Sequence, residues 1–434
     1  MDLYEISCLW SDVKQSHRSA YLRLDPEAPD FTDRSVFKAH ICIGDSDLLL
    51  EVTPDDAREF GAWLDTTVFD KDCLDRLYTW NLKSLISYIR FFTGKSPTPS
   101  TAIYDLKVIE NFLGIRQNRP ENFADAVDRM TKIMARKIWP SIYKTIHLPI
   151  LLRTLPIIET NPLLNVNIKR PEFPFYEIEG QPFGRMNCLK KFSKSYVPHN
   201  MGPDIRAVLR PRGDGYCFLN ADFRHCEVSV LQWLSSDPKL KEFLDSNQDL
   251  HCSTYEALTN TPCDNEEKRE MGKMLFFPVM YGCGAATLAK TINVSEDVAR
   301  ELIRRLKVTY PVAWKWMEDQ QEKARAGVIQ DYCGRPRKFE EAYRARDFMV
   351  QGTAATACQE KLIDLVDALD GEQAYMACSV HDGVYVCTKL KAAKETYHTV
   401  KTIMESPSKV CPGLSMKVQI KLGPRLDAMK VFEW

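Results

Sequence analysis

The stretch Lys268–Gly282, KREMGKMLFFPVMYG, has the most informative spacing in the chain. If the stretch is helical, four side chains recur at steps of four and lie along one face: Arg269, Lys273, Phe277 and Tyr281. This face spans about 18 Å, the length of a nucleoside triphosphate. The two cations would hold phosphates while the ring stacks on a base or sugar. The alternative is an amphipathic helix with a solvated basic edge, and the four matched positions followed by Gly282 favour the binding face.

The same stretch resembles the fingers helix of family A DNA polymerases, the DNA polymerase I group, whose pattern is R-x-x-x-K-x-x-x-F-x-x-x-Y-G. One position departs from the pattern, because Pro278 stands where the family usually has glycine. The resemblance implies that the four aligned residues bind a deoxynucleoside triphosphate (dNTP). It also implies that Lys273 is catalytic, protonating the pyrophosphate that leaves.

A carboxylate follows an apolar run in YCFLNADFRHCEVSVLQWL, where a strand from Tyr216 is expected to end at Asp222 and a helix to start near Glu227. By itself such an aspartate is usually a cap or turn residue. The string resembles the family motif D-Y-S-Q-I-E-L-R, with Tyr, Ser and Gln replaced by Phe223, Arg224 and His225. The resemblance implies that Asp222 and the Phe223 carbonyl bind metal and that Glu227 excludes a 2′-hydroxyl.

A second carboxylate lies in AYMACSVHDGVYVCT, which predicts two short strands joined by a turn at His381-Asp382-Gly383. The turn resembles the family's V-H-D-E, with Gly383 in place of the glutamate. An Asp-Gly turn alone is ordinary hairpin chemistry. Paired with Asp222, however, Asp382 supplies the second carboxylate that a two-metal phosphoryl transfer requires, and two Mg²⁺ ions are the implied cofactor.

Four further stretches carry contacts that the resemblance implies. QDLH is similar to the family's D-I-H-T and places His251 against the triphosphate. The segments FGRM, NMGPDIR, DYCGRPRKF and VQGTAA supply candidate contacts to DNA, to which the histidine of V-H-D adds one more: Arg185, Arg206, Arg335, Arg337, Gln351 and His381. For the two arginines of DYCGRPRKF, the alternative is a basic hairpin turn.

The N-terminal part reads as mixed α/β, and FKAHICIGDSDLLLEV predicts two strands around a turn. The order of elements and the sequence NLK at 81–83 are similar to the family's 3′–5′ exonuclease domain. Only Asp25, Glu27 and Asp105 could be remnants of its metal ligands, since Ser84 and Leu85 replace the tyrosine and aspartate that follow NLK in the family. We therefore expect an inactive scaffold that does not proofread.

The resemblance implies an α/β (α+β) right-hand polymerase fold with five segments: a degenerate exonuclease-like domain (1–118), a reduced thumb or connector (119–182), palm (183–250), fingers (251–345) and palm again (346–434). Residues 126–167 are similar to the helix that leads into the family's thumb. Hardly enough residues remain between Asn167 and Arg185 for one thumb-tip helix. We therefore expect weak grip on duplex DNA unless a processivity factor or another replisome protein assists.

The 434 residues allow two or three domains, and the formal charge of -1 means that any contact to nucleic acid comes from local patches. One such patch is Lys190, Lys191 and Lys194, for which a solvated loop is the alternative. The fourteen cysteines show no zinc spacing, which favours free thiols in a reducing compartment. No signal peptide or membrane span is evident, so a cytoplasmic protein is expected.

These features favour a template-directed DNA polymerase that acts on primer–template DNA and dNTPs. The nearest alternative is a single-subunit RNA polymerase, which shares both aspartates but keeps a small residue where this chain has Glu227. The alternative from another class is an inactive DNA-binding replisome scaffold. The presence of Asp222, Lys273 and Asp382 together argues against a scaffold, which has no need of them.

Overall fold

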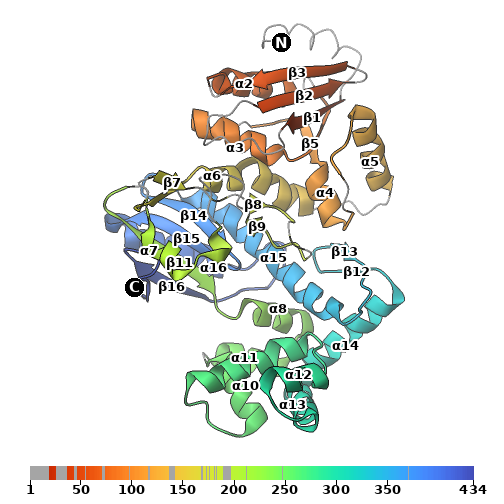
Figure 1. Ribbon diagram of the computed structural model, residues 1–434, viewed down its shortest axis with the longest axis vertical. Helices are drawn as coiled ribbons and strands as arrows, with labels where there is room; N and C mark the ends of the chain where they lie inside the picture. The colour runs from red at the N-terminus through yellow and green to blue at the C-terminus, as the bar shows by residue number, and fades with distance from the viewer. Residues whose placement is uncertain are drawn as a thin grey trace. The chain divides into compact units, whose positions relative to one another are not determined.

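The structure is a computed structural model that describes residues 19–25, 37–43, 46–53, 55–70, 74–96, 98–115, 118–135, 142–167, 170–172, 174, 176–179, 181, 183–188, 197–211, 213–246, 248–369 and 371–434. The chain divides into two compact units. The first contains residues 1–222, 358–404 and 418–434, and the second contains residues 223–357 and 405–417. Figure 1 labels the elements of both.

The N-terminal part of the first unit is a five-stranded mixed sheet in the order β3-β2-β1-β4-β5. Its strands are β1 (Ser19–Asp25), β2 (Phe37–Ile43), β3 (Ser46–Val52), β4 (Arg76–Thr79) and β5 (Ala102–Asp105). β1 to β3 pair antiparallel, as FKAHICIGDSDLLLEV predicts, whereas β4 and β5 run parallel to β1. The helices of this part are α2 (Ala57–Trp63), the π-helix η2 (Leu64–Val68), α3 (Leu82–Thr93), α4 (Leu106–Phe112) and α5 (Phe123–Ala135).

Of the carboxylates considered as exonuclease remnants, Asp105 is the one whose side chain lies within the described residues. Asp105 is fully buried, and its carboxylate accepts hydrogen bonds from the backbone N–H groups of Leu82 (2.8 Å) and Val108 (3.3 Å). It therefore caps the starts of two helices. The side chain of Asp25 and all of Glu27 lie outside the described residues, as do the three lysines of the 190–194 patch.

A helical connector follows, made of the π-helices η3 (Tyr143–His147) and η4 (Ile150–Thr154) and of α6 (Leu155–Glu159). α6 packs against α3 and against strand β14 (Ala374–Val380). A buried network holds it there: Lys83 Nζ lies 2.6 Å from Glu159 Oε1, and Ser87 donates to the other oxygen at 2.8 Å. The helix predicted through Asn167 is thus wrong at its end, because it stops at Glu159, before Pro162.

From the end of α6 to Pro203 the described residues form only short elements. These are β6 (Leu163–Asn165), β7 (Arg170–Glu172), β8 (Tyr176–Glu177), β9 (Asn187–Cys188) and the 3₁₀ turn η5 (Pro198–Asn200). They are followed by α7 (Pro203–Val208) and by β10 (Leu209–Arg210), which pairs with β6.

A second five-stranded sheet in the first unit has the order β14-β15-β11-β16-β17. Its strands are β11 (Tyr216–Phe223), β14 (Ala374–Val380), β15 (Gly383–Lys389), β16 (Val418–Gly423) and β17 (Lys430–Val431); the 3₁₀ turn η6 (Leu390–Ala392) and α16 (Ala393–Glu405) follow β15. β14 is buried on both faces, which explains its continuous apolar sequence. The predicted hairpin at 381–383 joins β14 to β15.

The second unit is mainly helical (Figure 1). It contains α8 (Cys226–Ser235), α9 (Pro238–Asp245), α10 (Leu250–Thr259), α11 (Glu266–Met280), α12 (Ala285–Ile292), α13 (Glu296–Thr309), α14 (Pro311–Ala326), the short strands β12 (Ile329–Gln330) and β13 (Pro336–Arg337), and the start of α15 (Arg344–Ala368). The helix predicted from the 268–282 spacing is α11. It ends two residues after Pro278, as expected where proline removes a hydrogen bond.

The expectation that all cysteines are free thiols is wrong in one place. Cys252 and Cys263 form a disulfide, although cysteines lie scattered in the sequence and no motif marks this pair. Ten other described cysteines are not part of a disulfide, six of them in the first unit and four in the second: Cys42, Cys188, Cys217, Cys358, Cys378, Cys387, Cys226, Cys283, Cys333 and Cys411. Among the described residues no helix is long and apolar enough to cross a membrane.

Candidate active site

The two candidate metal ligands lie at the ends of neighbouring strands, with Asp222 in β11 and Asp382 in the turn before β15. β11 and β15 pair antiparallel with Asp222 opposite Gly383, so Asp382, the residue before Gly383, comes beside Asp222. A β-carbon at position 383 would lie 3.0 Å from Oδ2 of Asp222. A side chain here would crowd the Asp222 carboxylate, which gives Gly383 a physical role in this chain.

The electrostatics of the pair reflect this closeness. Asp222 as a whole is exposed to solvent, whereas its carboxylate is largely surrounded by protein atoms. This burial raises the pKa of Asp222 to about 7, the negative charge of Asp382 adds to the rise, and Lys421 opposes it. Two carboxylates that repel each other in the free protein are the arrangement that a divalent cation relieves.

The residues present fit Mg²⁺ of the kind that binds substrate phosphates. The described residues contain no group of three or more histidine, cysteine or carboxylate side chains that could hold a metal ion. Mg²⁺ in phosphoryl-transfer sites uses one or two carboxylates, and waters and substrate phosphates supply the remaining ligands. Asp222 and Asp382 meet this requirement, with the Phe223 carbonyl at the end of β11 as the further predicted ligand.

A histidine that the sequence analysis missed stacks on the predicted DNA-contact residue His381. The rings of His199 and His381 lie 4.8 Å apart at 28°. Burial lowers the pKa of His199 to about 4, and the charges of His381 and Arg185 add to the effect. Arg185, the first predicted DNA contact, therefore belongs to the same cluster. No sequence signal could have found this pair, because the two histidines lie far apart in the chain.

In the second unit, α10 and α11 pack closely and carry the predicted nucleotide-binding residues. A β-carbon on Gly272 of α11 would lie 1.9 Å from the carbonyl oxygen of His251 on α10. Only glycine permits this approach. The sequence analysis missed Gly272, although a glycine inside a helical pattern is a recognised signal of close packing.

The close packing brings His251 beside the α11 face. The rings of His251 and Phe277 lie 6.2 Å apart, edge to face, and those of Phe277 and Tyr281 lie 6.0 Å apart. Burial lowers the pKa of His251, and the charges of Arg269 and Lys273 contribute while Asp249 opposes them. The Nδ1 atom of His251 is buried without a hydrogen-bond partner among the described residues.

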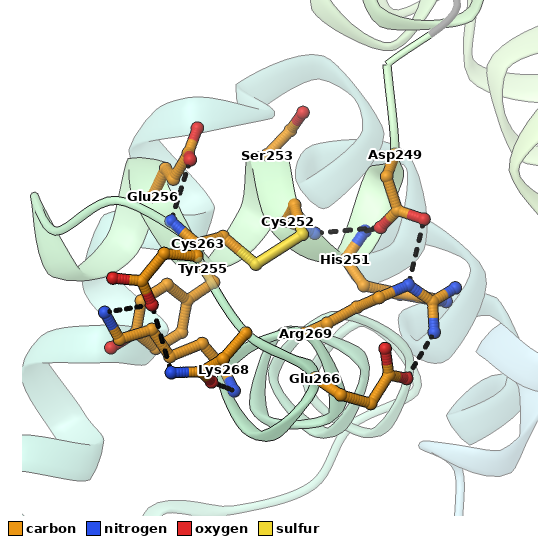
Figure 2. Close-up of a disulfide and its surroundings, with 12 residues drawn as sticks. Asp249, His251, Cys252, Ser253, Tyr255, Glu256, Cys263, Glu266, Lys268 and Arg269 are labelled. Atoms are coloured by element: carbon orange, nitrogen blue, oxygen red, sulfur yellow. Dashed lines mark hydrogen bonds and ion pairs between the residues drawn. A yellow bond between two sulfur atoms is a disulfide. The ribbon is translucent and has the colours of Figure 1, made fainter.

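Arg269 is held in place from two sides, as Figure 2 shows. Its Nε donates to Asp249 Oδ2 at 3.0 Å, and another nitrogen donates to Glu266 at 3.1 Å. The second oxygen of Asp249 caps α10 by accepting from the N–H groups of His251 and Cys252, both at 3.0 Å. Asp249 thus ties the predicted phosphate ligand Arg269 to the helix that carries His251. Lys273 is more exposed and lies 3.8 Å from Glu270.

The disulfide joins α10 to the loop that leads into α11 (Figure 2). Cys252 lies in the first turn of α10, next to His251, and Cys263 lies in the loop that leads into α11. The Cys263 N–H donates to Glu256 at 2.9 Å, which fixes this loop against α10. The crosslink therefore closes the loop between the two helices that carry the candidate phosphate ligands.

The predicted sugar-contact residues meet directly. The Tyr281 hydroxyl donates to Glu227 Oε2 at 2.5 Å. Glu227 lies in the first turn of α8 and Tyr281 at the C-terminal cap of α11, so the contact joins two helices within the second unit. The sequence analysis placed both residues at the nucleotide and did not show that they contact each other.

The remaining residues predicted to contact DNA differ in their burial and in their hydrogen-bond partners. Arg206 donates to the Met201 carbonyl at 2.9 Å, and Arg337 lies in the β12–β13 hairpin with one nitrogen on the Pro336 carbonyl at 2.7 Å. Gln351 is half-buried on α15. Arg335 as a template contact is wrong: it is fully buried and pairs with Asp331, because the tight turn directs its side chain into the core.

Comparison with known proteins agrees with this geometry. The model of DNA polymerase family A matches residues 192–428, which is more than half of the chain. The chain therefore belongs to DNA polymerase family A. The matched region contains Asp222, Asp382 and the whole second unit.

Among curated relatives, the chain is 27% identical over 234 residues to DNA polymerase I of Chloroflexus aurantiacus, covering 50% of this chain and 24% of the relative. It is 27% identical over 208 residues to the thermostable DNA polymerase I of Thermus filiformis (44% and 25%) and 26% identical over 203 residues to the DNA polymerase of Mycobacterium phage L5 (46% and 32%). The matches thus span about a quarter to a third of these relatives.

A solved structure extends the likeness to nearly the whole chain. It is the POL domain of Pol1 from M. smegmatis, in complex with DNA primer-template and dNTP. The TM-score is 0.74 with 14% sequence identity, and the alignment covers 99% of both chains. The fold is therefore that of a family A polymerase domain, in which α/β and helical parts are combined as expected.

Proposed function

We propose that this protein is a template-directed DNA polymerase, which extends the 3′ end of a primer with deoxynucleotides. The observation that carries the proposal is the pair of carboxylates Asp222 and Asp382, at the end of β11 and in the turn before β15, where burial and the charge of Asp382 raise the pKa of Asp222. Membership of the family and the fold support the same reaction.

In this proposal the primer 3′-oxygen attacks the α-phosphorus of a dNTP, and pyrophosphate leaves. Two Mg²⁺ ions, when bound, increase the nucleophilicity of the attacking oxygen and stabilise the charge on the leaving group. Asp222 and Asp382 hold them. Arg269 and His251 bind the phosphate tail, with Arg269 oriented by Asp249. Lys273 also contacts the phosphates and gives a proton to the leaving pyrophosphate oxygen.

The base and sugar are bound by the C-terminal half of α11. Phe277 stacks on the incoming nucleotide, and the hydrogen-bonded pair of Tyr281 and Glu227 occupies the space of a 2′-hydroxyl. Because Glu227 already accepts a hydrogen bond from Tyr281, admitting a ribonucleotide requires that this contact break or move. The pocket therefore selects deoxynucleotides.

Primer–template DNA is contacted by residues of both units in this proposal. Arg185, Arg206 and His381 contribute from the first unit, and Arg337 and Gln351 contribute from the second. Arginine contacts to phosphates position the duplex, whereas Gln351 reads the minor groove of the terminal pair. The side chain of Gln351 has no hydrogen-bond partner among the described residues and is available for this contact.

The N-terminal domain acts as a scaffold without proofreading. Asp105 is committed to capping two helix starts, and Lys83 of the NLK sequence is buried in an ion pair with Glu159. Neither side chain is accessible to a DNA strand. A metal-dependent exonuclease requires carboxylates that can reach both metals and substrate.

One assay tests the proposal. A labelled primer–template is incubated with the full chain, Mg²⁺ and either dNTPs or ribonucleotides, and both gain and loss of primer length are scored. We expect extension with dNTPs, little with ribonucleotides, and no shortening of a mismatched primer. A lack of extension by the wild-type protein, with DNA binding intact, would favour the inactive scaffold instead.

A further inference from the structure

The second unit contains a pocket of about 220 Å³ that is separate from the α11 face. α8, α9 and the segment 413–417 enclose it. Its lining includes four residues with basic side chains, one ring and one carboxylate: Arg224, His225, Lys241, Lys417, Phe243 and Asp245. Two of these, Arg224 and His225, stand where the family motif has serine and glutamine.

The pocket carries positive charge that the protein itself does not neutralise. Lys241 is paired with Asp245 at 3.0 Å. The side chains of Arg224 and Lys417 have no ion pair or hydrogen bond among the described residues. Burial and the charge of Arg224 lower the pKa of His225, as expected for an imidazole in a positive environment. Two cationic groups thus remain free to bind an anion.

The walls of the pocket are fixed by hydrogen bonds. The Arg224 N–H donates to the Lys417 carbonyl at 2.8 Å, which ties the two unpaired cations to each other through the backbone. Trp233 of α8 donates to the Pro412 carbonyl at 3.3 Å, and Ser415 donates to the Glu405 carbonyl at 2.7 Å. On the α9 side, the rings of His225 and Phe243 lie 5.2 Å apart, edge to face. The pocket is therefore built in the free protein.

We propose that this pocket binds a phosphate group, with Arg224 and Lys417 as the charged ligands. The volume limits the choice, because pockets for drug-sized ligands measure roughly 300–1,000 Å³ and this pocket is smaller. A phosphate or pyrophosphate fits, and a whole nucleotide does not. An arginine fork beside a lysine is a common arrangement for phosphate oxygens. The phosphate comes either from a nucleic-acid backbone or from a free anion.

This inference goes beyond the proposed function, because binding here requires neither catalysis nor Mg²⁺. Inorganic phosphate and pyrophosphate are titrated into the full chain by calorimetry without metal. All proteins used in this titration also carry Arg269→Ala and Lys273→Ala, so that phosphate binding at the α11 face does not contribute to the measured heat. We expect Arg224→Ser and Lys417→Gln each to weaken binding about tenfold, the effect of losing one charge-assisted contact. Lys239→Gln is the matched control, since Lys239 lies on α9, pairs with Glu242 and does not line the pocket.

A second arm identifies the source of the phosphate. The affinity of the otherwise wild-type chain for duplex DNA is measured against salt concentration. If the pocket holds a backbone phosphate, Arg224→Ser and Lys417→Gln each reduce the slope by about 0.9, whereas Lys239→Gln leaves it unchanged. If the pocket variants keep the wild-type salt slope for DNA but bind free phosphate more weakly, the ligand is a free anion. If neither measurement distinguishes the pocket variants from Lys239→Gln, the proposal is overturned.

Discussion

Gly272 lies so close to His251 that a β-carbon at position 272 would be 1.9 Å from the His251 carbonyl oxygen. This contact sets the distance between α10 and α11 and so places His251 beside the residues predicted to bind phosphates. Replacing glycine by alanine inside a helix normally stabilises it by about 1 kcal/mol. Here the sign is reversed, because the obstructing atom belongs to the backbone and cannot rotate away.

We therefore expect Gly272→Ala to destabilise the protein by about 1–3 kcal/mol, the usual range for overpacking, and to raise the KM for dNTPs. Gly284→Ala is the control, since a β-carbon at Gly284 meets no atom within 4 Å. Urea denaturation and steady-state extension provide the two readouts. Equal behaviour of the two variants would mean that the helices are not packed as described.

Replacing either palm aspartate by asparagine should abolish most extension while the fold is kept. Asparagine retains an oxygen ligand but removes the charge that holds Mg²⁺. We expect Asp222→Asn and Asp382→Asn each to reduce the extension rate roughly 100-fold or more, the effect seen when one group that stabilises developing charge is lost. Single-turnover extension is the measurement, with circular dichroism as the check on folding. A variant with wild-type rate would contradict the metal-ligand assignment.

The raised pKa of Asp222 predicts how the metal-free protein responds to pH. In the unfolded chain this carboxyl ionises near its ordinary value, whereas the pKa in the folded protein is about 7. The contribution of Asp222 to stability is therefore fully present below about pH 4 and is lost as the pH rises through 7. We expect the Tm of the wild type, relative to Asp222→Asn, to fall between pH 4 and 7 without metal and to recover with Mg²⁺.

Asp382→Asn provides the control for this pH effect. Removing the neighbouring charge leaves burial as the main cause of the raised pKa, so the fall in relative Tm should move to lower pH. A difference between wild type and Asp222→Asn that does not change with pH would show that the pKa of Asp222 is not raised in the folded protein.

The hydrogen bond between Tyr281 and Glu227 makes sugar selection testable. Glu227→Ala opens the space predicted for a 2′-hydroxyl, and we expect the preference for dNTPs over ribonucleotides, as a ratio of kcat/KM, to fall roughly 10- to 100-fold. Tyr281→Phe removes only the donor and should have a smaller effect in the same direction. Phe277→Tyr should leave the ribonucleotide ratio alone and reduce discrimination against dideoxynucleotides. Unchanged ratios in all three variants would mean that the nucleotide pocket lies elsewhere.

Reduction of the disulfide should loosen the α10–α11 pair. Cys252 and Cys263 are 11 residues apart, and closing a loop of this size stabilises a protein by roughly 2–3 kcal/mol. We expect dithiothreitol to lower the stability of the wild type by about this amount, while a Cys252→Ala/Cys263→Ala double variant does not respond. Alkylation and mass spectrometry before and after reduction show whether these two thiols are protected. Full labelling of both without reductant would contradict the crosslink.

The amino-acid sequence by itself determined the local elements and the chemistry that they carry. The four-residue repeat from Arg269 to Tyr281 specifies one helix face, since helical periodicity depends only on neighbouring residues. Asp222 at the end of an apolar run and Asp382 in an Asp-Gly turn were placed correctly on strand ends for the same reason. The mixed α/β character of the N-terminal part also follows from local pattern.

Only the tertiary structure decided which side chains meet across elements. An arginine in a basic turn is the residue type expected of an exposed template contact. In the fold, however, Arg335 is buried and pairs with Asp331. The sequence left Asp105 as a possible metal ligand. In the fold its carboxylate is buried and accepts hydrogen bonds from the N–H groups at the starts of two helices. The His199–His381 stack, the Cys252–Cys263 link and the pocket at Arg224 and Lys417 join residues distant in sequence or unmarked by any motif. Such contacts depend on long-range packing, which residue type and spacing do not encode locally.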